Sequence, residues 1–390
     1  MRIEKLQLRH FRNYESQELE FTDGINVFIG ENAQGKTNAL EAISFLALGK
    51  SHRTHKDQEM IQWNQDHAVI EGQVLAQNRM QRMRMEFLKN GKKAQINGVH
   101  VTKMTDFIGR FQVVLFAPED LLLVKGSPGQ RRRFIDMELG QTKPKYLYHL
   151  GQYGRIVQQR NTLLKQHNAD LSYLAVFDDQ FVEHAVPILL ERFRFVEEMK
   201  RLAKDIYDTI ADRRETFELR YVCSIPGFKG DYFPGIEATS LSGHLHDQHA
   251  RQQLSQQLGD MIRSGLEQKR RQDQQIGYTT IGPHRDDLTF FLNGQSVHSF
   301  ASQGQQRTIA LALRLAEIEF IRKESGEYPV LLLDDVLSEL DDRRQTNLLL
   351  SMSEKVQTVI TTTSLFHLSE KLGEGTRLFY VRSGIIQKEG

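Results

Sequence analysis

A glycine-bounded loop lies between a short apolar run and a helical pattern near the start of this chain, and it limits the folds that the chain can adopt. The apolar run covers residues 26–29, the loop extends from Gly30 to Thr37, and helical spacing begins at Lys36. The loop matches G-x-x-x-x-G-K-[ST] at every position. A strand, a glycine loop and a helix in this order gather backbone N–H groups and a helix N-terminus around an anion. The sequence therefore predicts an α/β fold built around a phosphate-binding loop.

The loop residues have predicted roles in holding a nucleotide. Gly30 and Gly35 let the backbone approach the phosphates. The cradle is completed by Glu31, Asn32, Ala33 and Gln34. Lys36 is expected to reach the β- and γ-phosphates and to act in catalysis, and the Thr37 hydroxyl is expected to ligate Mg²⁺. ATP and Mg²⁺ are thus the predicted ligands. The alternative, a chance glycine turn before a helix, is disfavoured by the strand and helix on either side.

A second acidic site follows the apolar run 330–333, which ends in Asp334 and Asp335. A buried strand would deliver Asp334 beside the phosphates, where it could hold Mg²⁺ through water. Asp335 would then orient the attacking water or accept its proton. The alternative is that the two acids only end a strand and begin a turn.

A third motif starts the helical stretch at about residues 305–323. Ser302 is a good N-cap residue, and Gly304 follows it within the first turn. A serine and a glycine at a helix start can form an anion site. The 32 residues from Ser302 to Asp334 leave room for one helix and a turn. Simple helix capping is the alternative interpretation.

The periodicity of the chain changes twice and predicts its organisation. Residues 1–140 and 275–390 have α/β patterns and are expected to form one nucleotide-binding head. Residues 141–274 are mainly helical and are expected to form an inserted arm, in which Pro187 should kink or divide the second helix. Asn-Gly pairs predict three hairpins, at residues 90–91, 97–98 and 293–294.

One segment is strongly basic although the whole chain has a net charge of only +1. Residues 79–133 contain 12 Lys and Arg against 4 Asp and Glu, a net of +8. Strand alternation places Arg82 and Arg84 opposite an apolar face. Near the following turn lie Lys89, Lys92 and Lys93. This pattern predicts a face that contacts DNA phosphates with little sequence specificity. A solvated sheet edge guarded by lysines is an equally weighted alternative.

Composition excludes several other classes. The single cysteine, Cys223, excludes a disulfide framework and a four-cysteine zinc site. No signal peptide and no run of about 20 apolar residues is present, so a cytoplasmic protein without a membrane role is expected. His284, close to Asp286 and Asp287, could suggest a metal site. A structural turn is the favoured interpretation, and no metal beyond Mg²⁺ is predicted.

Several segments in addition to these motifs resemble the RecF family, within the SMC-like branch of ABC ATPases. They are residues 8–14, 38–43, 49–54, 118–121, 131–136, 282–288, 333–336 and 338–341. The last of these, Ser338 to Asp341, resembles the D-loop. Together with the phosphate loop and the segment around Ser302, they span roughly residues 6 to 341 in the order typical of the family.

The resemblance implies an ABC-type head with a helical arm, in a cytoplasmic protein of DNA repair and replication. Such proteins bind single- or double-stranded DNA and form a homodimer with ATP. They help load the RecA recombinase at gaps, with RecR and RecO as partners, and support the SOS response. Weak, DNA-dependent ATP hydrolysis would act as a switch. By the same resemblance, Arg12 and Asn13 contact nucleotide, and Ser302 and Gly304 meet the γ-phosphate held by a second copy.

Three positions depart from the pattern of ABC ATPases. Aspartate replaces the usual glutamate at residue 335 and is one methylene shorter, so slow turnover is expected. The Q-loop glutamine has no clear counterpart, and Gln112 or the pair Pro118-Glu119 are the candidates. No histidine directly follows the strand-like residues 358–361, which leaves Thr362 or Thr363 for the switch position.

Two other protein classes share some of these motifs. A transporter ATPase would have the same loop and acids, but 272 residues separate Gly30 from Ser302, far more than in a compact transporter subunit. A long coiled-coil SMC protein would need hundreds of heptad residues, whereas the insertion here has about 130. A zinc-hook variant would also need a Cys-x-x-Cys motif, which is absent.

Overall fold

The computed structural model describes residues 1–166, 171–211, 213, 215–228, 247–336, 355–364 and 375–388. The chain divides into two compact units, unit 1 (Met1–Asp120 and Glu317–Gly390) and unit 2 (Leu121–Ala316). The boundaries expected from the sequence, near residues 140 and 274, lie inside unit 2. Helix α4 (Pro128–Thr142) packs there against strand β10 (Asp287–Leu292), so segments on either side of the helical block share one core.

Unit 1 contains a six-stranded antiparallel sheet, sheet A. Its order is β2 (Tyr14–Glu20), β1 (Arg2–Phe11), β4 (His67–Ala76), β5 (Arg79–Leu88), β6 (Gly91–Ile96) and β7 (Val99–Val101). The predicted hairpins at residues 90–91 and 97–98 are both present. A further hairpin turns at Gln77 and Asn78, which both have positive φ, 51° and 55°. It lacks the Asn-Gly signal and was therefore not predicted.

A second six-stranded sheet in unit 1, sheet B, carries the predicted nucleotide motifs. Its order is β15 (Ile385–Lys388), β14 (Arg377–Arg382), β3 (Ile25–Ile29), β13 (Thr358–Thr362), β12 (Val330–Asp334) and β8 (Val113–Phe116). All neighbours are parallel except the edge strand β15. Every residue of β3 and β12 is buried, which explains their continuous apolar sequence.

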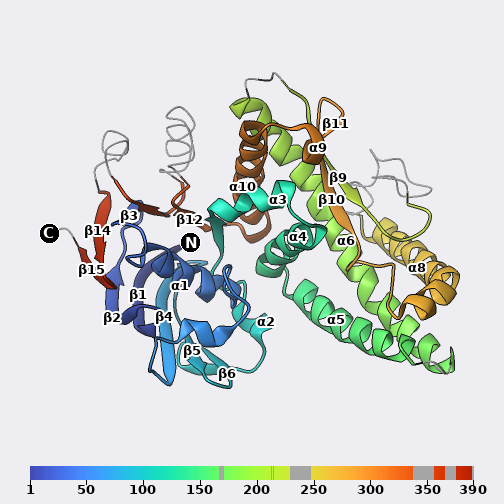
Figure 1. Ribbon diagram of the computed structural model, residues 1–390, viewed down its shortest axis with the longest axis horizontal. Helices are drawn as coiled ribbons and strands as arrows, with labels where there is room; N and C mark the ends of the chain where they lie inside the picture. The colour runs from blue at the N-terminus through green and yellow to red at the C-terminus, as the bar shows by residue number, and fades with distance from the viewer. Residues whose placement is uncertain are drawn as a thin grey trace. The chain divides into compact units, whose positions relative to one another are not determined.

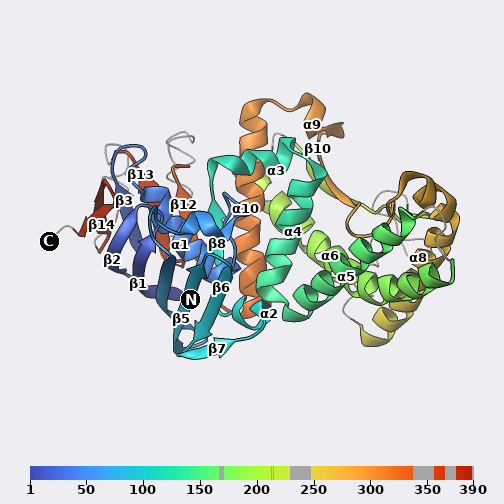
Figure 2. The same ribbon diagram turned by 60° about the horizontal axis from the view of Figure 1, so that its bottom comes forward.

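Helix α1 (Lys36–Leu48) lies against both sheets of unit 1 (Figures 1 and 2). It contacts β4 and β5 of sheet A and β8, β12 and β13 of sheet B. Its side chains are buried nearly all round, as expected of a helix between two layers. Since β3 and β12 are both parallel to β13, their carboxyl ends share the edge where α1 begins. Shorter helices of this unit are η1 (Asp57–Met60), α2 (Met104–Phe107) and η2 (Pro118–Asp120).

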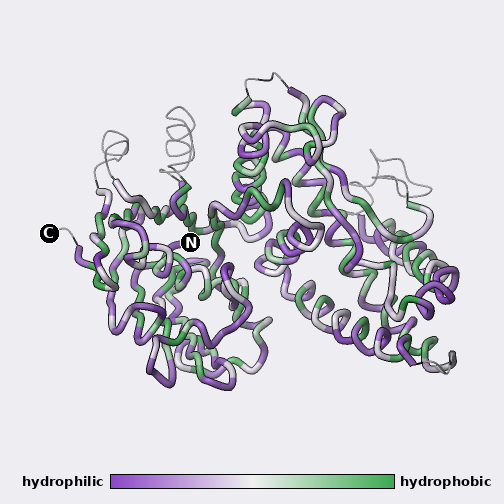
Figure 3. The backbone as a smooth tube through the Cα atoms, viewed as in Figure 1, coloured by the Kyte–Doolittle hydropathy of each residue, from purple (hydrophilic) through white to green (hydrophobic). Residues whose placement is uncertain are grey.

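Unit 2 is mainly helical. Its larger helices are α4, α5 (Pro144–Leu164), α6 (Leu171–Ile210) and α8 (Gln248–Ile276), and α10 (Gln303–Ser325) begins in it. The shorter helices are α3 (Leu121–Lys125) and α9 (Val297–Phe300). Helix α6 packs against α5, α8 and β9, and along α5 and α6 hydrophilic and hydrophobic residues alternate (Figure 3). Within the described part of the chain, no helix combines the length and apolarity needed to cross a membrane.

A small antiparallel sheet, sheet C, completes unit 2 with β9 (Phe217–Val222), β10 and β11 (Gln295–Ser296). The predicted hairpin at residues 293–294 joins β10 to β11. Strand β9 was not predicted, because its partner β10 lies about 70 residues further along the chain.

Of the two outcomes expected for Pro187, a kink or a division of the helix, the division is wrong, since α6 continues through it as one helix of 40 residues. The neighbouring Val186, Ile188 and Leu189 are buried. Packing of this apolar side therefore outweighs the hydrogen bond that proline removes.

Candidate nucleotide-binding site

The shape of the phosphate loop depends on its two glycines. A Cβ atom on Gly30 would lie 2.3 Å from the carbonyl oxygen of Val381 in β14. Gly35 has a φ of 122°, and a Cβ atom there would lie 2.6 Å from Nδ2 of Asn13. No other residue fits either position without moving its neighbours. The loop between β3 and α1 is thus closely surrounded by the rest of the unit.

The β1–β2 turn braces this loop from one side. Asn13 Nδ2 donates to the carbonyl oxygen of Gln34 at 2.9 Å, and the Tyr14 hydroxyl donates to that of Gly35 at 2.7 Å. The side-chain oxygen of Asn13 accepts from Asn38 of α1 at 2.8 Å. Asn13 was expected to contact nucleotide, and in this structure its amide ties the loop to the first turn of α1.

Lys36 lies between the loop and the acidic residues of β12. Its Nζ donates to the carbonyl oxygens of Gly30 and Glu31, at 2.7 and 2.8 Å. Burial lowers the pKa of Lys36, while the charges of Asp335 and Asp334 oppose that shift. The structure therefore brings together the lysine and both acids that the sequence singled out.

The two acids are held by hydroxyl groups from neighbouring elements. Thr37 Oγ1 donates to Asp334 Oδ1 at 2.9 Å, and Thr361 Oγ1 donates to the same oxygen at 2.8 Å. The backbone N–H of Asp335 donates to Thr361 Oγ1 at 2.9 Å. Thr361 ends up here because β13 lies between β3 and β12 in sheet B. Sequence reasoning placed the switch at Thr362 or Thr363, one or two residues after the threonine that touches both acids.

The donor set suits the predicted ligands. A threonine hydroxyl and a carboxylate 2.9 Å apart supply the oxygen atoms that Mg²⁺ prefers. A glycine loop at a helix N-terminus with an adjacent lysine suits a polyphosphate. Among the described residues there is no cluster of three His, Cys, Asp or Glu side chains that would indicate another metal.

A buried ion pair joins the β1–β2 turn to the middle of α1. Arg12, at the turn with a φ of 55°, donates to both carboxylate oxygens of Glu41 at 2.9 and 2.8 Å. Ser51 Oγ also donates to Glu41. Burial alone would raise the pKa of Glu41, but hydrogen bonds from Arg12 and Ser51 lower it below its ordinary value. Arg12 was expected to contact nucleotide, yet its guanidinium is engaged with Glu41. The sequence offered one sign of this ion pair that was not used: Glu41 is a charged residue within an otherwise apolar helix.

The end of β8 decides between the Q-loop candidates. Val113 pairs with Val330 and Phe116 with Leu333, so β8 runs parallel to β12. Gln112 precedes β8 and therefore lies at the edge of sheet B opposite to Asp334, which makes it the wrong candidate. Glu119 follows the carboxyl end of β8 and therefore lies at the same edge of sheet B as Asp334.

His52 is a neighbour of this edge that sequence reasoning did not single out. Burial lowers its pKa, while the nearby charges of Glu41, Asp334 and Glu119 oppose the shift.

The segment around Ser302 forms a self-contained helix cap at the start of α10. Gln305 N donates to Ser302 Oγ at 3.2 Å, and Ser302 N donates to the side-chain oxygen of Gln305 at 2.7 Å. Ser302 and Gly304 are both exposed in unit 2. Capping therefore accounts for the local structure, and the exposed helix start remains able to meet a partner. The D-loop candidate, residues 338–341, lies outside the described residues.

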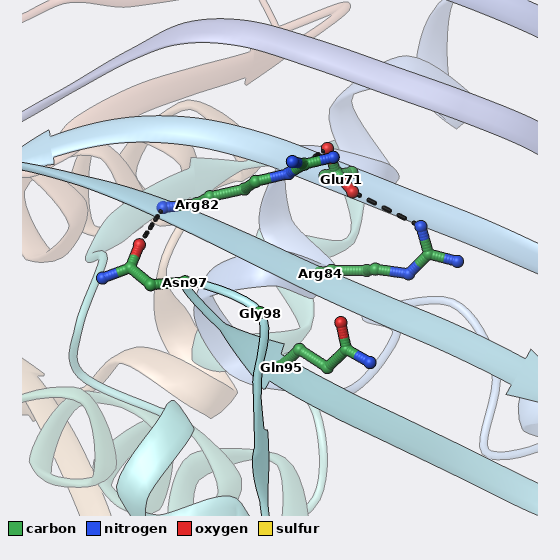
Figure 4. A pocket seen from close by; sticks show the side chains of 6 residues that line it. All are labelled: Glu71, Arg82, Arg84, Gln95, Asn97 and Gly98. Carbon is green, nitrogen blue, oxygen red and sulfur yellow. Dashed lines mark hydrogen bonds and ion pairs between the residues drawn. The ribbon is translucent and has the colours of Figure 1, made fainter.

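The basic face predicted on sheet A is present in part. Met83, Met85 and Phe87 are fully buried, so Arg82 and Arg84 point to the outer face. Arg82 Nε donates to Glu71 at 2.6 Å and Arg84 Nη1 at 3.4 Å. Both guanidinium groups lie beside Glu71 (Figure 4), and the three residues help to line a pocket of about 400 Å³. Its other lining residues are Gln95, Asn97 and Gly98.

The three lysines near the β5–β6 turn do not share one face. Lys92 pairs with buried Phe87 across the strands, so it lies on the inner face of the sheet. Its Nζ bonds the carbonyl oxygen of Gly49 at 2.8 Å and Asp57 at 2.9 Å. Lys89 is at the turn and pairs with Asp66, and Lys93 is exposed. The structure thus separates Lys92 from the other candidate DNA contacts.

Unit 2 has its own buried charged cluster, around the loop of residues 279–287. Arg192, which is 1% exposed, donates to the Pro283 carbonyl oxygen at 2.6 Å and to Asp136 at 2.8 Å. His284 Nδ1 lies 2.6 Å from the Tyr153 hydroxyl, and burial lowers the His284 pKa to about 4. These contacts support the structural-turn interpretation of the loop.

Asp286 and the arginine-rich start of α4 belong to the same region. Asp286 is fully buried and accepts from the Tyr221 hydroxyl at 2.6 Å and from Ser224 at 2.7 Å. Arg131 makes a two-pronged pair with Asp287 at 2.7 and 2.9 Å. Asp286 and Asp287 therefore have their hydrogen-bond and ion-pair partners within the same region of the protein.

Comparison with known proteins agrees with this geometry. Residues 2–387 match the family model described as RecF/RecN/SMC N terminal domain. The chain is 44% identical to the DNA replication and repair protein RecF of Oceanobacillus iheyensis, over 99% of this chain and 100% of that protein. It is 43% identical to the protein of the same name from Latilactobacillus sakei, over 100% and 99% of the two chains.

Solved structures give the same result. The recombination mediator protein RecF with ATP, of the RecFOR pathway, has a TM-score of 0.87 at 30% identity, covering 100% of this chain and 97% of that one. An Smc head domain from Pyrococcus furiosus shares the fold, with a TM-score of 0.55 at 17% identity over 99% and 95% of the two chains. The chain belongs to the RecF family of DNA replication and repair proteins, with the fold of an SMC-like ABC-type ATPase.

Proposed function

We propose that this chain is an ATP-driven switch of recombinational repair and replication. Its ATP-bound homodimer clamps DNA and helps load the RecA recombinase at gaps, and slow hydrolysis resets it. The observation that carries the proposal is the meeting of Thr37 and Asp334 at 2.9 Å, beside Lys36 and a glycine-dependent loop. The similar solved structure named RecF-ATP supports ATP as the nucleotide.

In this proposal the residues from Gly30 to Thr37 hold the phosphates. Thr37 and Asp334 hold Mg²⁺, which when bound offsets the negative charge of the phosphates. Asp335 follows Asp334 directly and is the candidate group for orienting water or accepting its proton. Its short side chain supports slow hydrolysis.

The dimer would be completed by the start of α10. Ser302 and Gly304 are exposed, and the first turn of a helix carries partial positive charge. We propose that these residues meet the γ-phosphate held by a second copy. An interface of this kind exists only while ATP is bound, which couples nucleotide to dimerisation.

The DNA contacts belong to the outer face of sheet A in this proposal. Arg82, Arg84, Lys89 and Lys93 supply positive charge toward the phosphate backbone. The Lys89–Asp66 pair is exposed and can exchange for phosphate at modest cost, whereas Glu71 is nearly buried and would keep part of its contacts with Arg82 and Arg84. Lys92 would support the turn from the inner face.

The remaining assignments follow from family membership. We propose RecR and RecO as partners, supported by the RecFOR pathway named for the similar structure, and a role in the SOS response in the cytoplasm. We also propose that residues 1–140 and 275–390 act as the ATPase head and residues 141–274 as its arm.

Equilibrium binding of a fluorescent duplex to an Asp335→Asn variant tests the clamp. With Mg-ATP at fixed salt, we expect binding at least tenfold tighter than without nucleotide, and cooperative in protein concentration. The matched double variant Asp335→Asn/Ser302→Arg should lose that gain but keep ATP binding. Equal affinity with and without ATP would contradict the clamp mechanism.

A further inference from the structure

The only tryptophan of the chain stands almost completely in solvent. Trp63 is 90% exposed, in the loop between η1 and β4 of unit 1. Large aromatic side chains are usually well covered, because their burial contributes strongly to stability. A single aromatic ring on a surface does not by itself mark a binding site, so its attachment and its surroundings decide what it can bind.

The segment that leads into Trp63 is firmly attached to sheet A. Met60 is fully buried and its carbonyl oxygen accepts from Arg12 N at 2.9 Å. Ile61 forms a β-bridge with Phe11. Gln62 N donates to the His10 carbonyl oxygen at 2.8 Å. Trp63 therefore projects from a backbone that sheet A holds in place, which lowers the entropy cost of binding a flat partner.

The surroundings of Trp63 are basic. Gln58 Nε2 donates to the Lys89 carbonyl oxygen at 2.7 Å, and Lys89 pairs with Asp66 at 2.5 Å. These contacts join the tryptophan loop to the β5–β6 turn. Residues 50–67 and 89–93 together contain six Lys and Arg against three Asp and Glu, and five of the six remain when Lys92, which lies on the inner face, is left out. A polyanion is therefore favoured over an acidic or neutral apolar surface as the occupant.

We propose that Trp63 stacks on an unpaired base of DNA whose backbone passes Lys89 and Lys93. The inference rests on the proposed DNA-binding function and adds a specificity for single-stranded segments to it. Stacking on an aromatic ring is possible for any base, because every base has a π-face, but the base must be free of a duplex stack. The arrangement would let one protein hold a duplex and sense the unpaired strand beside it.

Tryptophan fluorescence tests the inference directly, because Trp63 is the only emitter of its kind. The full chain is titrated with a gapped duplex, a single-stranded oligonucleotide and a blunt duplex, each with Mg-ATP. We expect quenching by the first two and little change with the blunt duplex.

Affinity measurements with variants provide the second readout. Trp63→Leu should bind gapped DNA about 5- to 100-fold more weakly, since stacking on one base has about that effect. Its binding to blunt duplex should stay unchanged. Trp63→Phe should keep most of the affinity for gapped DNA. Tyr173→Leu, which removes a 63% exposed aromatic from α6, is the matched control and should have no effect.

The outcomes separate this inference from the proposed function. Unchanged fluorescence and unchanged affinity of Trp63→Leu for gapped DNA would overturn the stacking site while ATP-dependent duplex binding stands. An equal loss for gapped and blunt DNA would also overturn it, because unpaired bases would then be irrelevant. Absence of binding to every DNA would instead contradict the proposed function itself.

Discussion

The two units each contain a buried cluster of charged residues. The clusters differ in whether their hydrogen-bond partners all lie within the protein. In unit 1, Lys36, Thr37 and Asp334 meet at the edge of sheet B beside a loop that only glycine can form. In unit 2, Arg192 and Asp286 lie in the interior and bond protein groups on several sides. The first arrangement lies at a helix N-terminus whose backbone N–H groups can bind an outside anion, whereas the second has its partners within the protein.

The difference shows that charge and burial alone do not identify a functional site. Paired acids, a basic group and hydroxyl donors occur in both clusters. What distinguishes the nucleotide site is a glycine loop at a helix N-terminus, which supplies backbone donors to an outside anion. The unit 2 cluster lacks such a loop, and we infer a structural role for it. Substitutions in the two clusters should therefore affect different properties.

The largest effect is expected from Arg192→Ala in unit 2. It removes the partner of Asp136 from a buried site and should lower the free energy of unfolding by about 3–5 kcal/mol. Urea unfolding followed by circular dichroism provides the measurement. Arg201→Ala, on the same helix but in an exposed pair with Glu198, is the control and should cost at most about 1 kcal/mol. Similar losses for the two variants would contradict the proposed structural role of the cluster.

His284 should make the stability of unit 2 depend on pH. Its pKa is about 4 in the folded protein against 6.5 ordinarily, so the unfolded state binds more protons between these values. This contribution to stability is complete above pH 6.5 and is lost as the pH falls toward 4. The change amounts to about 3 kcal/mol. Urea unfolding at a series of pH values in this range gives the free energy of unfolding as a function of pH. That free energy should depend less on pH in His284→Gln than in the unsubstituted chain, and an identical dependence would exclude the prediction.

Asp335→Asn should change catalysis and leave stability nearly intact. Removing the candidate proton acceptor should slow single-turnover ATP hydrolysis about 100-fold. ATP affinity should stay within a few-fold, because Lys36 and the loop are unchanged. Asp334→Asn provides the comparison and should instead weaken nucleotide binding in a Mg²⁺-dependent manner. If Asp335→Asn hydrolyses ATP at the normal rate, another group must orient the water.

The smallest effect is expected from Ser302→Arg. In this proposal the exposed start of α10 contacts the nucleotide of the second copy and not the nucleotide of its own chain. ATP binding by the monomer should therefore be unchanged. ATP-dependent dimerisation should weaken about tenfold or more, as measured by analytical ultracentrifugation. Ser302→Thr can retain the cap and serves as the conservative control. Dimerisation that is insensitive to Ser302→Arg would place the interface elsewhere.

Much of the fold could be predicted because its signals are local. The apolar runs at 26–29 and 330–333 became the fully buried strands β3 and β12, and Asn-Gly pairs marked three hairpins. The turn at Gln77 and Asn78 was missed because its positive φ values are imposed by strand pairing rather than by glycine. Pro187 does not divide α6, because the packing around this helix outweighs a local preference.

The phosphate loop, its partner aspartate and the motifs of the family could all be identified from the amino-acid sequence. Each of these is a continuous segment whose spacing carries the information. Three features depend on how the chain folds: Arg12 bonds Glu41, Thr361 joins the two acids, and Lys92 faces inward. The order and register of strands decide such contacts, because a shift of one residue turns a side chain to the other face.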